Sequence, residues 1–308
     1  MDYRRDPTME FVMSVRFSLG VALACCAMWS SAWSSVSAQD RATWNAPQTP
    51  FKVFGNTYYV GPHGLSSILI ATSHGLVLID GDLPESASLI EAHIKALGFR
   101  VSDVHWILNS HAHSDHAGGI AQLQYDSGAQ VLASAPGAHA LELGGADPDD
   151  PQFGLAPTYT PVHHVRAVRD GEVVNLGGVE ITGHATPGHT PGSMSWTWRS
   201  CEGNTCLNIA YADSLTAYTN KTFRYTDDAK HPHRVEDFRK SIATVAALPC
   251  DILLTPHPDQ SNFWDKVQRR QTGVHPDALI DTAACKAYAA EALQNLDARL
   301  AKEKAEQP

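Results

Sequence analysis

The sequence predicts a layered α/β fold in which two β-sheets pack together and helices cover both outer faces. Short apolar runs separated by turns come first and helical spacings follow, and this order occurs twice along the chain. Strict alternation of strand and helix, which is typical of parallel βαβ folds, is not the pattern here. The 308 residues, of which 43% are hydrophobic and 18% charged, can bury a sizeable core and exclude a disordered chain.

The first half of the chain contains four short apolar runs ahead of its first helical spacing. They lie at residues 51–54, 56–60, 67–71 and 76–79 and predict an antiparallel meander. Further along, we expect helices at 85–97, 119–125 and 136–143, and strands at 104–108 and 131–133. Residues 144–161, rich in Gly, Pro and Asp, form a loop long enough to be functional.

The second half repeats this organisation. We expect two strands within 171–182, strands at 193–198, 206–212 and 252–254, and helices at 235–248 and 282–301. We therefore treat residues 39–308 as a single domain built of two αβ halves, about 45–165 and 166–308.

Residues 1–38 have the pattern of a secretory signal peptide. Arg16 precedes an uncharged run from 17 to 33, and Val36-Ser37-Ala38 is a small-x-small cleavage site. The residues before Met13 are read as a start-site artefact. A transmembrane anchor is the alternative, but the apolar core is short and rich in Ser and Ala. A lipoprotein is a lesser alternative, because the residues up to Cys25 partly resemble a lipobox. We expect a periplasmic protein without stable membrane association, and a monomer by default.

Charge and cysteine count limit the partners and the compartment. The leader holds three basic and three acidic residues, so the mature chain keeps the formal charge of −10 of the whole chain, which argues against a nucleic-acid partner. Four cysteines remain, an even number that suggests disulfides in an exported protein. We favour Cys201–Cys206, which would face each other across a hairpin turn, together with Cys250–Cys285. Free buried thiols are the alternative.

Four potential metal ligands lie within six residues at the end of a predicted buried strand. His111 and His113, two apart on an extended chain, point the same way and can face one metal. Asp115 and His116 come off the following turn, toward a second position nearby. Imidazole and carboxylate ligands suit Zn²⁺, and a structural reason for so dense a cluster is hard to find.

Two more histidines follow predicted strands in the second half. His189 stands in the Gly- and Pro-rich run Pro187-Gly188-His189-Thr190-Pro191-Gly192, and His257 follows the strand at 252–254. Loops at strand ends are where site residues gather in layered folds. Alongside the first cluster, we expect both to be metal ligands.

These three motifs resemble the metallo-β-lactamase superfamily. His116 together with Ser214, in Asp213-Ser214-Leu215-Thr216, is similar to subclass B3, the exported dizinc enzymes. The resemblance covers nearly all of the mature chain. It implies an αββα four-layer sandwich of two mixed sheets, and it agrees with the leader and with the pair Cys250–Cys285.

The resemblance also implies the roles of single residues. His111, His113 and His189 would hold one Zn²⁺, and Asp115, His116 and His257 a second. A hydroxide shared by the two ions would attack the β-lactam amide of penicillins, cephalosporins and carbapenems, giving antibiotic resistance, and Asp115 would orient it.

Further residues are expected around this centre. Ser214 and Thr216 would receive the substrate carboxylate, and Gln152 and Trp44 are weaker candidates for substrate contact. Asp213 and Asp80 would hydrogen-bond around the centre without ligating. Tyr218 and Tyr225 are both possible assisting tyrosines, and neither is assigned.

Two other functions remain as alternatives. A lactonase or thioester hydrolase of the same fold would share almost every ligand, and Asp213 would then bridge the metals. A zinc-binding or storage protein without turnover would need no open coordination position, whereas three protein ligands for each metal leave room for water and substrate.

Overall fold

The structure, a computed structural model, describes residues 38–273 and 275–306. The predicted leader therefore lies outside the described residues, except for Ala38, which begins helix α1 (Ala38–Trp44). None of the helices in the described part of the chain has the length and apolarity needed to cross a membrane.

The first sheet has seven strands in sequential order. Antiparallel pairing links the first four, as the meander predicted, and parallel pairing links β4 to β5, β5 to β6 and β6 to β7. Its strands are β1 (Phe51–Phe54), β2 (Thr57–Tyr59), β3 (Ile68–Thr72), β4 (Gly75–Ile79), β5 (Val104–Leu108), β6 (Gln130–Ala133) and β7 (Arg166–Ala167).

The second sheet has five strands in the order β12-β11-β10-β9-β8. Its pairs are antiparallel except β11 with β12, which is parallel. Its strands are β8 (Val173–Leu176), β9 (Val179–Ala185), β10 (Met194–Glu202), β11 (Thr205–Tyr211) and β12 (Ile252–Leu254). Both sheets are thus mixed, which confirms the predicted fold class.

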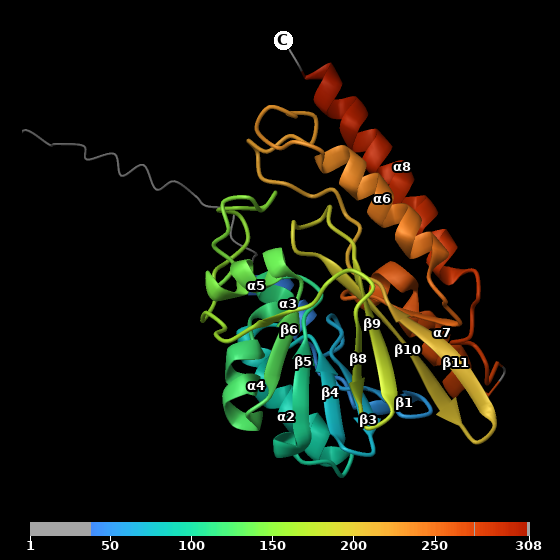
Figure 1. The fold of residues 1–308 in the computed structure, drawn as a ribbon. Coiled ribbons are helices and arrows are strands. Elements are labelled where there is room, and N and C mark those ends of the chain that lie inside the picture. Colours follow the sequence, from blue (N-terminus) through green and yellow to red (C-terminus); the bar gives the residue numbers. More distant parts are fainter. Residues whose placement is uncertain (1–37, 274, 307–308) are drawn as a thin grey trace, which may run out of the picture. The chain divides into compact units, whose positions relative to one another are not determined.

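Helices cover the outer faces of the two sheets. Figure 1 shows α2 and α4 beside the strands of the first sheet and α6 and α8 beside those of the second, on opposite sides. The helices after α1 are α2 (Ala87–Ala96), α3 (Ser114–Ala117), α4 (Ile120–Ser127), α5 (Ala135–Glu142), α6 (Arg234–Ala247), α7 (Phe263–Gln271) and α8 (Ala284–Ala305), and the 3₁₀ helices are η1 (Pro84–Ser86), η2 (Val101–Asp103) and η3 (Pro258–Ser261).

Three apolar clusters mark the interfaces between four layers. On β3, Ile68 and Ile70 pack in the cluster between the sheets, while Leu69 packs in the cluster under α2 and α4. On β12, Ile252 faces the inter-sheet cluster and Leu253 the cluster under α6 and α8. Successive side chains of a strand point to opposite faces, so both faces of each sheet are buried. Each fully buried Ile or Leu contributes about 1.5–3 kcal/mol.

Both expected disulfides are present. Cys201 and Cys206 pair directly across the β10–β11 hairpin, with Cα atoms 4.0 Å apart. Cys250, just before β12, is joined to Cys285 in the first turn of α8. The second bond ties the long C-terminal helix to the strand that precedes His257.

Candidate metal centre

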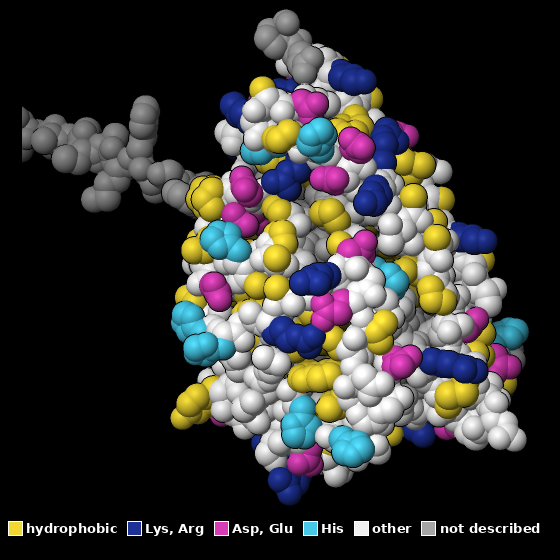
Figure 2. Space-filling model, viewed as in Figure 1, with side chains coloured by type: hydrophobic (Ala, Val, Ile, Leu, Met, Phe, Trp, Pro, Cys, Tyr) yellow, Lys and Arg dark blue, Asp and Glu magenta, His cyan; other side chains and the backbone are white. Residues whose placement is uncertain are grey.

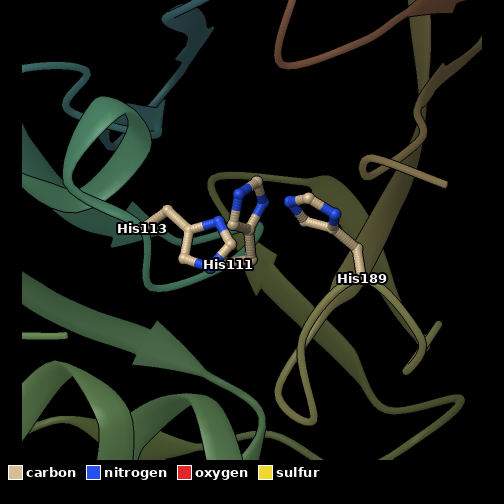
Figure 3. Close-up of side chains that lie close together, drawn as sticks. All are labelled: His111, His113 and His189. Carbon is tan, nitrogen blue, oxygen red and sulfur yellow. The ribbon is translucent and has the colours of Figure 1, made fainter. Parts of the chain in front are cut away.

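Strand ends from both sheets bring the histidines together. The chain leaves β5 at Leu108 and reaches His111 three residues later, while His189 follows β9 and His257 follows β12. Figure 3 shows His111 and His113 on one stretch of chain and His189 on a separate loop, with the three rings turned toward one another. The ring centroids are 4.8 to 4.9 Å apart, and all three side chains are buried.

One nitrogen of each ring is held by a hydrogen bond. His111 Nδ1 donates to Asp213 Oδ1 over 2.7 Å, and His113 Nε2 donates to Asp150 Oδ2 over 2.9 Å. His189 Nδ1 donates to the carbonyl oxygen of Thr216 over 2.9 Å. Because a neutral imidazole carries one proton, each remaining nitrogen presents a lone pair.

The three rings fit a divalent metal. Ligand atoms of His111, His113 and His189 lie within 4.8 Å of one another. His111 Nε2 is buried and has no hydrogen-bond partner among the described residues, which is costly unless a cation accepts its lone pair. Hydrogen bonds that fix the tautomer of ligating histidines are typical of metal sites.

A second group of ligands adjoins the first. His116 Nε2 and His257 Nε2 are 3.2 Å apart, and Asp115 Oδ2 lies 3.3 and 3.4 Å from them. Ligand atoms of Asp115 and His116 also lie within 4.8 Å of one on His111, so the two groups meet at that residue. The structure thus brings together the six residues that the sequence singles out as candidate ligands.

Burial and charge prepare most of these groups for a cation. Burial and the neighbouring His111 and His113 lower the pKa of His189 to about 3, so its ring is neutral at pH 7. Burial alone would raise the pKa of Asp115, but His116 and His257 hold it well below the usual range. Burial would lower the pKa of His116, but Asp115 raises it to about 9, so a proton competes with a cation there.

Asp80 organises the strand end without touching a histidine ring. Its carboxylate accepts hydrogen bonds from the Ser110 amide (2.7 Å), the Ser110 hydroxyl (2.6 Å), Asn109 Nδ2 (3.0 Å) and the Tyr211 hydroxyl (2.8 Å). These bonds fix the backbone immediately before His111.

Sequence reasoning missed two buried carboxylates of this centre. Asp150 holds His113, and its only signal is its place among the acidic residues of the loop at 144–161. Asp82 is buried beside His116: its amide donates to the His116 carbonyl over 3.1 Å, and neither its carboxylate oxygens nor His116 Nδ1 have a hydrogen-bond partner among the described residues. Burial raises the pKa of Asp82 well above the usual range.

A cleft of about 580 Å³ opens onto both ligand groups. Trp44 of α1 lines it, with its ring 5.5 Å from that of His257, and α1 is tied down by two hydrogen bonds from Arg41 to Glu85. The residues that line the cleft are Asp40, Trp44, His113, Ser114, Asp115, Gln152, Leu155, Ala156, Pro157, His189, Thr216, Tyr218 and His257.

Some of the residues expected to contact substrate line the cleft, and others are buried away from it. Gln152 and Thr216 line the cleft, and Gln152 Nε2 lies 3.5 Å from His189 Nε2. Ser214 is 1% exposed and is not among the lining residues; its Oγ has no partner in the described part of the chain. Tyr218 is 60% exposed and lines the cleft, whereas Tyr225 is buried and donates from its hydroxyl to the Gly188 carbonyl over 2.9 Å. Tyr218 is therefore the tyrosine of the two that a substrate can reach.

The chain resembles known metal-dependent hydrolases. The model of the metallo-beta-lactamase superfamily matches residues 60–202. The solved Rm3 metallo-beta-lactamase is 51% identical, with a TM-score of 0.84, over 87% of this chain and 99% of that one. MEM-A1, a subclass B3 metallo-beta-lactamase from a soil metagenome library, is 52% identical, with a TM-score of 0.83, over 86% of this chain and 100% of that one.

Curated relatives match a shorter part of the sequence. Hydroxyacylglutathione hydrolase of Anaeromyxobacter dehalogenans is 32% identical over 139 residues, which is 44% of either chain. A protein of the same name from Rhodopseudomonas palustris is 33% identical over 117 residues, 38% of this chain and 36% of that one. The chain thus spans less than half the length of these relatives.

Proposed function

We propose that this chain, which belongs to the subclass B3 metallo-β-lactamases, hydrolyses the amide bond of β-lactam antibiotics and so confers resistance to them. The observation that carries the proposal is the pair of adjoining candidate ligand groups that line one open cleft. The similarity to a solved metallo-beta-lactamase over 99% of that enzyme's chain supports it.

Two Zn²⁺ fit the donor set. His111, His113 and His189 would hold one ion, and Asp115, His116 and His257 the other, since imidazole and carboxylate donors suit zinc. When bound, the ions supply Lewis acidity that polarises the scissile carbonyl and brings the pKa of water to about 7. Three protein ligands for each ion leave positions open for water and substrate.

The side chains of the cleft orient water and substrate. The ionised Asp115 would accept a hydrogen bond from the attacking water and so orient a lone pair of the water oxygen toward the carbonyl carbon. No Lys or Arg is among the side chains that line the described cleft, so the substrate carboxylate is left to the metal centre and to hydroxyls such as that of Thr216. Ser214 joins Thr216 in that role if its buried hydroxyl becomes accessible. Gln152, Trp44 and Tyr218 contact the parts of the substrate away from the scissile bond.

A lactonase or thioester hydrolase is the second candidate function. The curated relatives named hydroxyacylglutathione hydrolase favour it, and so does Asp213 Oδ2, which is buried without a hydrogen-bond partner among the described residues. Against it, Asp213 Oδ1 accepts a hydrogen bond from His111 Nδ1, which is the part of a residue that orients a ligand. We assign Asp213 to orientation of His111, and Asp80 to support of the same strand end.

We place the mature protein in the periplasm as a monomer, free of the membrane after cleavage of the leader. The leader sequence and the two disulfides support this location, because disulfides persist in oxidising compartments. On the face drawn in Figure 2, basic and acidic side chains are interspersed, in keeping with a small-molecule substrate rather than a nucleic acid.

A substrate panel separates the two candidate functions. Purified residues 39–308, loaded with zinc, are assayed for kcat/KM on a carbapenem, a lactone and a thioester. We expect the carbapenem to be preferred by about 100-fold or more, since specificity is a difference in transition-state binding. Preference for the lactone or thioester would overturn the proposal in favour of the second candidate.

Two histidine variants tie the turnover to this site. His257→Ala removes a ligand of the second group and should lower kcat/KM about 100-fold or more. His163→Ala, which changes an exposed histidine outside the cleft, should leave it unchanged. If His257→Ala were as active as His163→Ala and the parent protein, the reaction would not take place at this site.

A further inference from the structure

The C-terminal helix carries a buried carboxylate where an apolar residue is expected. Along the buried face of α8, Ala292, Leu296 and Leu300 pack under the second sheet. Glu303 continues this face, three residues after Leu300, and is only 2% exposed. A buried charge is costly unless it is paired and hydrogen-bonded, so Glu303 must have polar partners nearby.

These partners belong to residues 213–226, which we call the wall segment. Glu303 Oε1 accepts from the Tyr225 amide over 3.2 Å, and Glu303 Oε2 accepts from both the amide and the hydroxyl of Thr226 over 3.0 Å. Burial would raise the pKa of Glu303, but these bonds and Arg299 hold it below its usual value, so it is ionised at neutral pH.

Arg299 completes the attachment one helical turn earlier. Its Nε donates to Glu303 Oε1 over 2.6 Å, and its Nη2 donates to Thr219 Oγ1 (2.7 Å) and to the Phe223 carbonyl (3.2 Å). Nearer the start of α8, the Tyr288 hydroxyl accepts from the Leu215 amide over 3.0 Å. Three side chains along one helix therefore hold the wall segment from one end to the other.

The wall segment reaches the metal centre and the substrate cleft. Its Thr216 carbonyl accepts from His189, and its Tyr225 hydroxyl bonds to Gly188, the residue before His189. Tyr218, which lines the cleft, stands between Thr216 and Thr219, both of which are fixed by hydrogen bonds.

The loop that carries Gln152 is joined to the same segment. The Asn220 amide donates to the Pro151 carbonyl over 2.8 Å, and Asn220 Nδ2 donates to the Phe153 carbonyl over 2.9 Å. These two carbonyls flank Gln152, which lines the cleft. The position of Gln152 thus depends on the wall segment as well.

We infer that Arg299 and Glu303 are positioning residues for substrate binding, which hold the wall segment so that Tyr218 and Gln152 face the cleft. The inference rests on the proposed function. Neither residue is among those that line the cleft, so both act through the segment. Contacts with non-reacting parts of the substrate contribute equally to the ground and transition states, so their loss raises KM and spares kcat.

Glu303→Gln tests the inference, with Asp297→Asn as the matched control. Asp297 also lies on α8 and pairs with Arg239 of α6, and within the described residues no hydrogen bond or ion pair joins it to the wall segment. For a carbapenem, Glu303→Gln should raise KM about 5- to 20-fold with kcat within about twofold, and the control should change neither. A merely structural role would lower the active fraction, and with it kcat, at unchanged KM.

Amide hydrogen exchange gives a readout that needs no turnover. In Glu303→Gln, peptides that contain Tyr225 and Thr226 should exchange at least tenfold faster, whereas those from the first sheet should not change. A parent chain without β-lactam turnover would count against the proposed function, and the exchange comparison would still decide the positioning role.

Arg299→Lys keeps the inference testable if Glu303→Gln does not fold. Lys retains a charge pair with Glu303 but loses the two bonds from Nη2 to Thr219 and Phe223. We expect a smaller rise in KM, and faster exchange around Thr219 and Phe223 but not around Tyr225 and Thr226. Parent-like exchange across residues 213–226 in the folded variants would overturn the inference.

Discussion

At the scale of single residues, the hydrogen bond from His111 to Asp213 decides which ring nitrogen is free. The carboxylate accepts from Nδ1, and this leaves Nε2 buried and turned to the other two histidines. Asp150 and the Thr216 carbonyl do the same for His113 and His189. The donor geometry is therefore fixed before a metal arrives.

Asp213→Asn should weaken the first zinc site. An amide can donate as well as accept, so the tautomer of His111 is no longer fixed, and zinc affinity should fall about 10- to 100-fold with two ions still bound at saturation. Competition with a chelator and metal analysis measure both quantities. Asp265→Asn, an exposed carboxylate of α7, is the control and should have no effect.

Two results would contradict this role of Asp213. Unchanged affinity would show that the hydrogen bond to His111 does not orient the ligand. Loss of one zinc ion even at saturation would show that Asp213 is itself a ligand, as the lactonase or thioesterase alternative requires.

The low pKa of His189 predicts how the metal-free protein responds to acid. The folded state binds this proton only near pH 3, whereas the unfolded state binds it near 6.5. The resulting stability is present above pH 6.5 and is lost as pH falls toward 3, by up to about 1.4 kcal/mol per pH unit.

His189→Gln removes this titration while other groups remain. Between pH 6 and pH 4, the free energy of unfolding of the metal-free parent should fall more steeply than that of the variant. The two slopes should differ by about 1.4 kcal/mol per pH unit, which corresponds to the uptake of one proton on unfolding. Denaturant titrations at several pH values measure both slopes. Identical slopes would mean that His189 titrates normally in the folded protein.

At the scale of elements, the sequence predicted those helices and strands whose apolar residues repeat over several positions. Leu69 and Ile70 of β3, buried on opposite faces, belong to a run of strand length, and α6 repeats its apolar residues over four turns. By contrast, β7 has two residues and α3 has four, too few to show a period. In α7 only Phe263 and Val267 are buried. Two apolar positions are too few to show a helical repeat, so this helix was not predicted from the sequence.

The two disulfides should differ in what they contribute to stability. Cys250–Cys285 spans 35 residues, and loop-closure entropy gives it about 4 kcal/mol. Cys201–Cys206 spans five residues, which gives about 2 kcal/mol. Replacing each pair by Ser should lower the free energy of unfolding in that order, as measured by denaturant titration. A larger loss from the hairpin pair would contradict loop length as the cause.

At the scale of the whole molecule, candidate ligands that follow strands of both sheets meet in one cluster. The sequence singled out all six of these residues as candidate ligands, because four lie within six residues and the other two follow predicted strands. It could not predict Asp150, which lies 37 residues from His113, or a backbone carbonyl such as that of Thr216, which has no side-chain signal. Nor could it show that Ser214 is buried while Tyr218 is exposed, since loop packing decides this.

The central claim is that two zinc ions held by these six residues support β-lactam hydrolysis. The most direct test is to remove metal from the purified mature chain with a chelator and return Zn²⁺ stepwise while carbapenem hydrolysis and bound metal are measured together. The account predicts that turnover is absent without metal and reaches its maximum at two zinc ions per chain. Absence of turnover in a folded, zinc-saturated sample would contradict it.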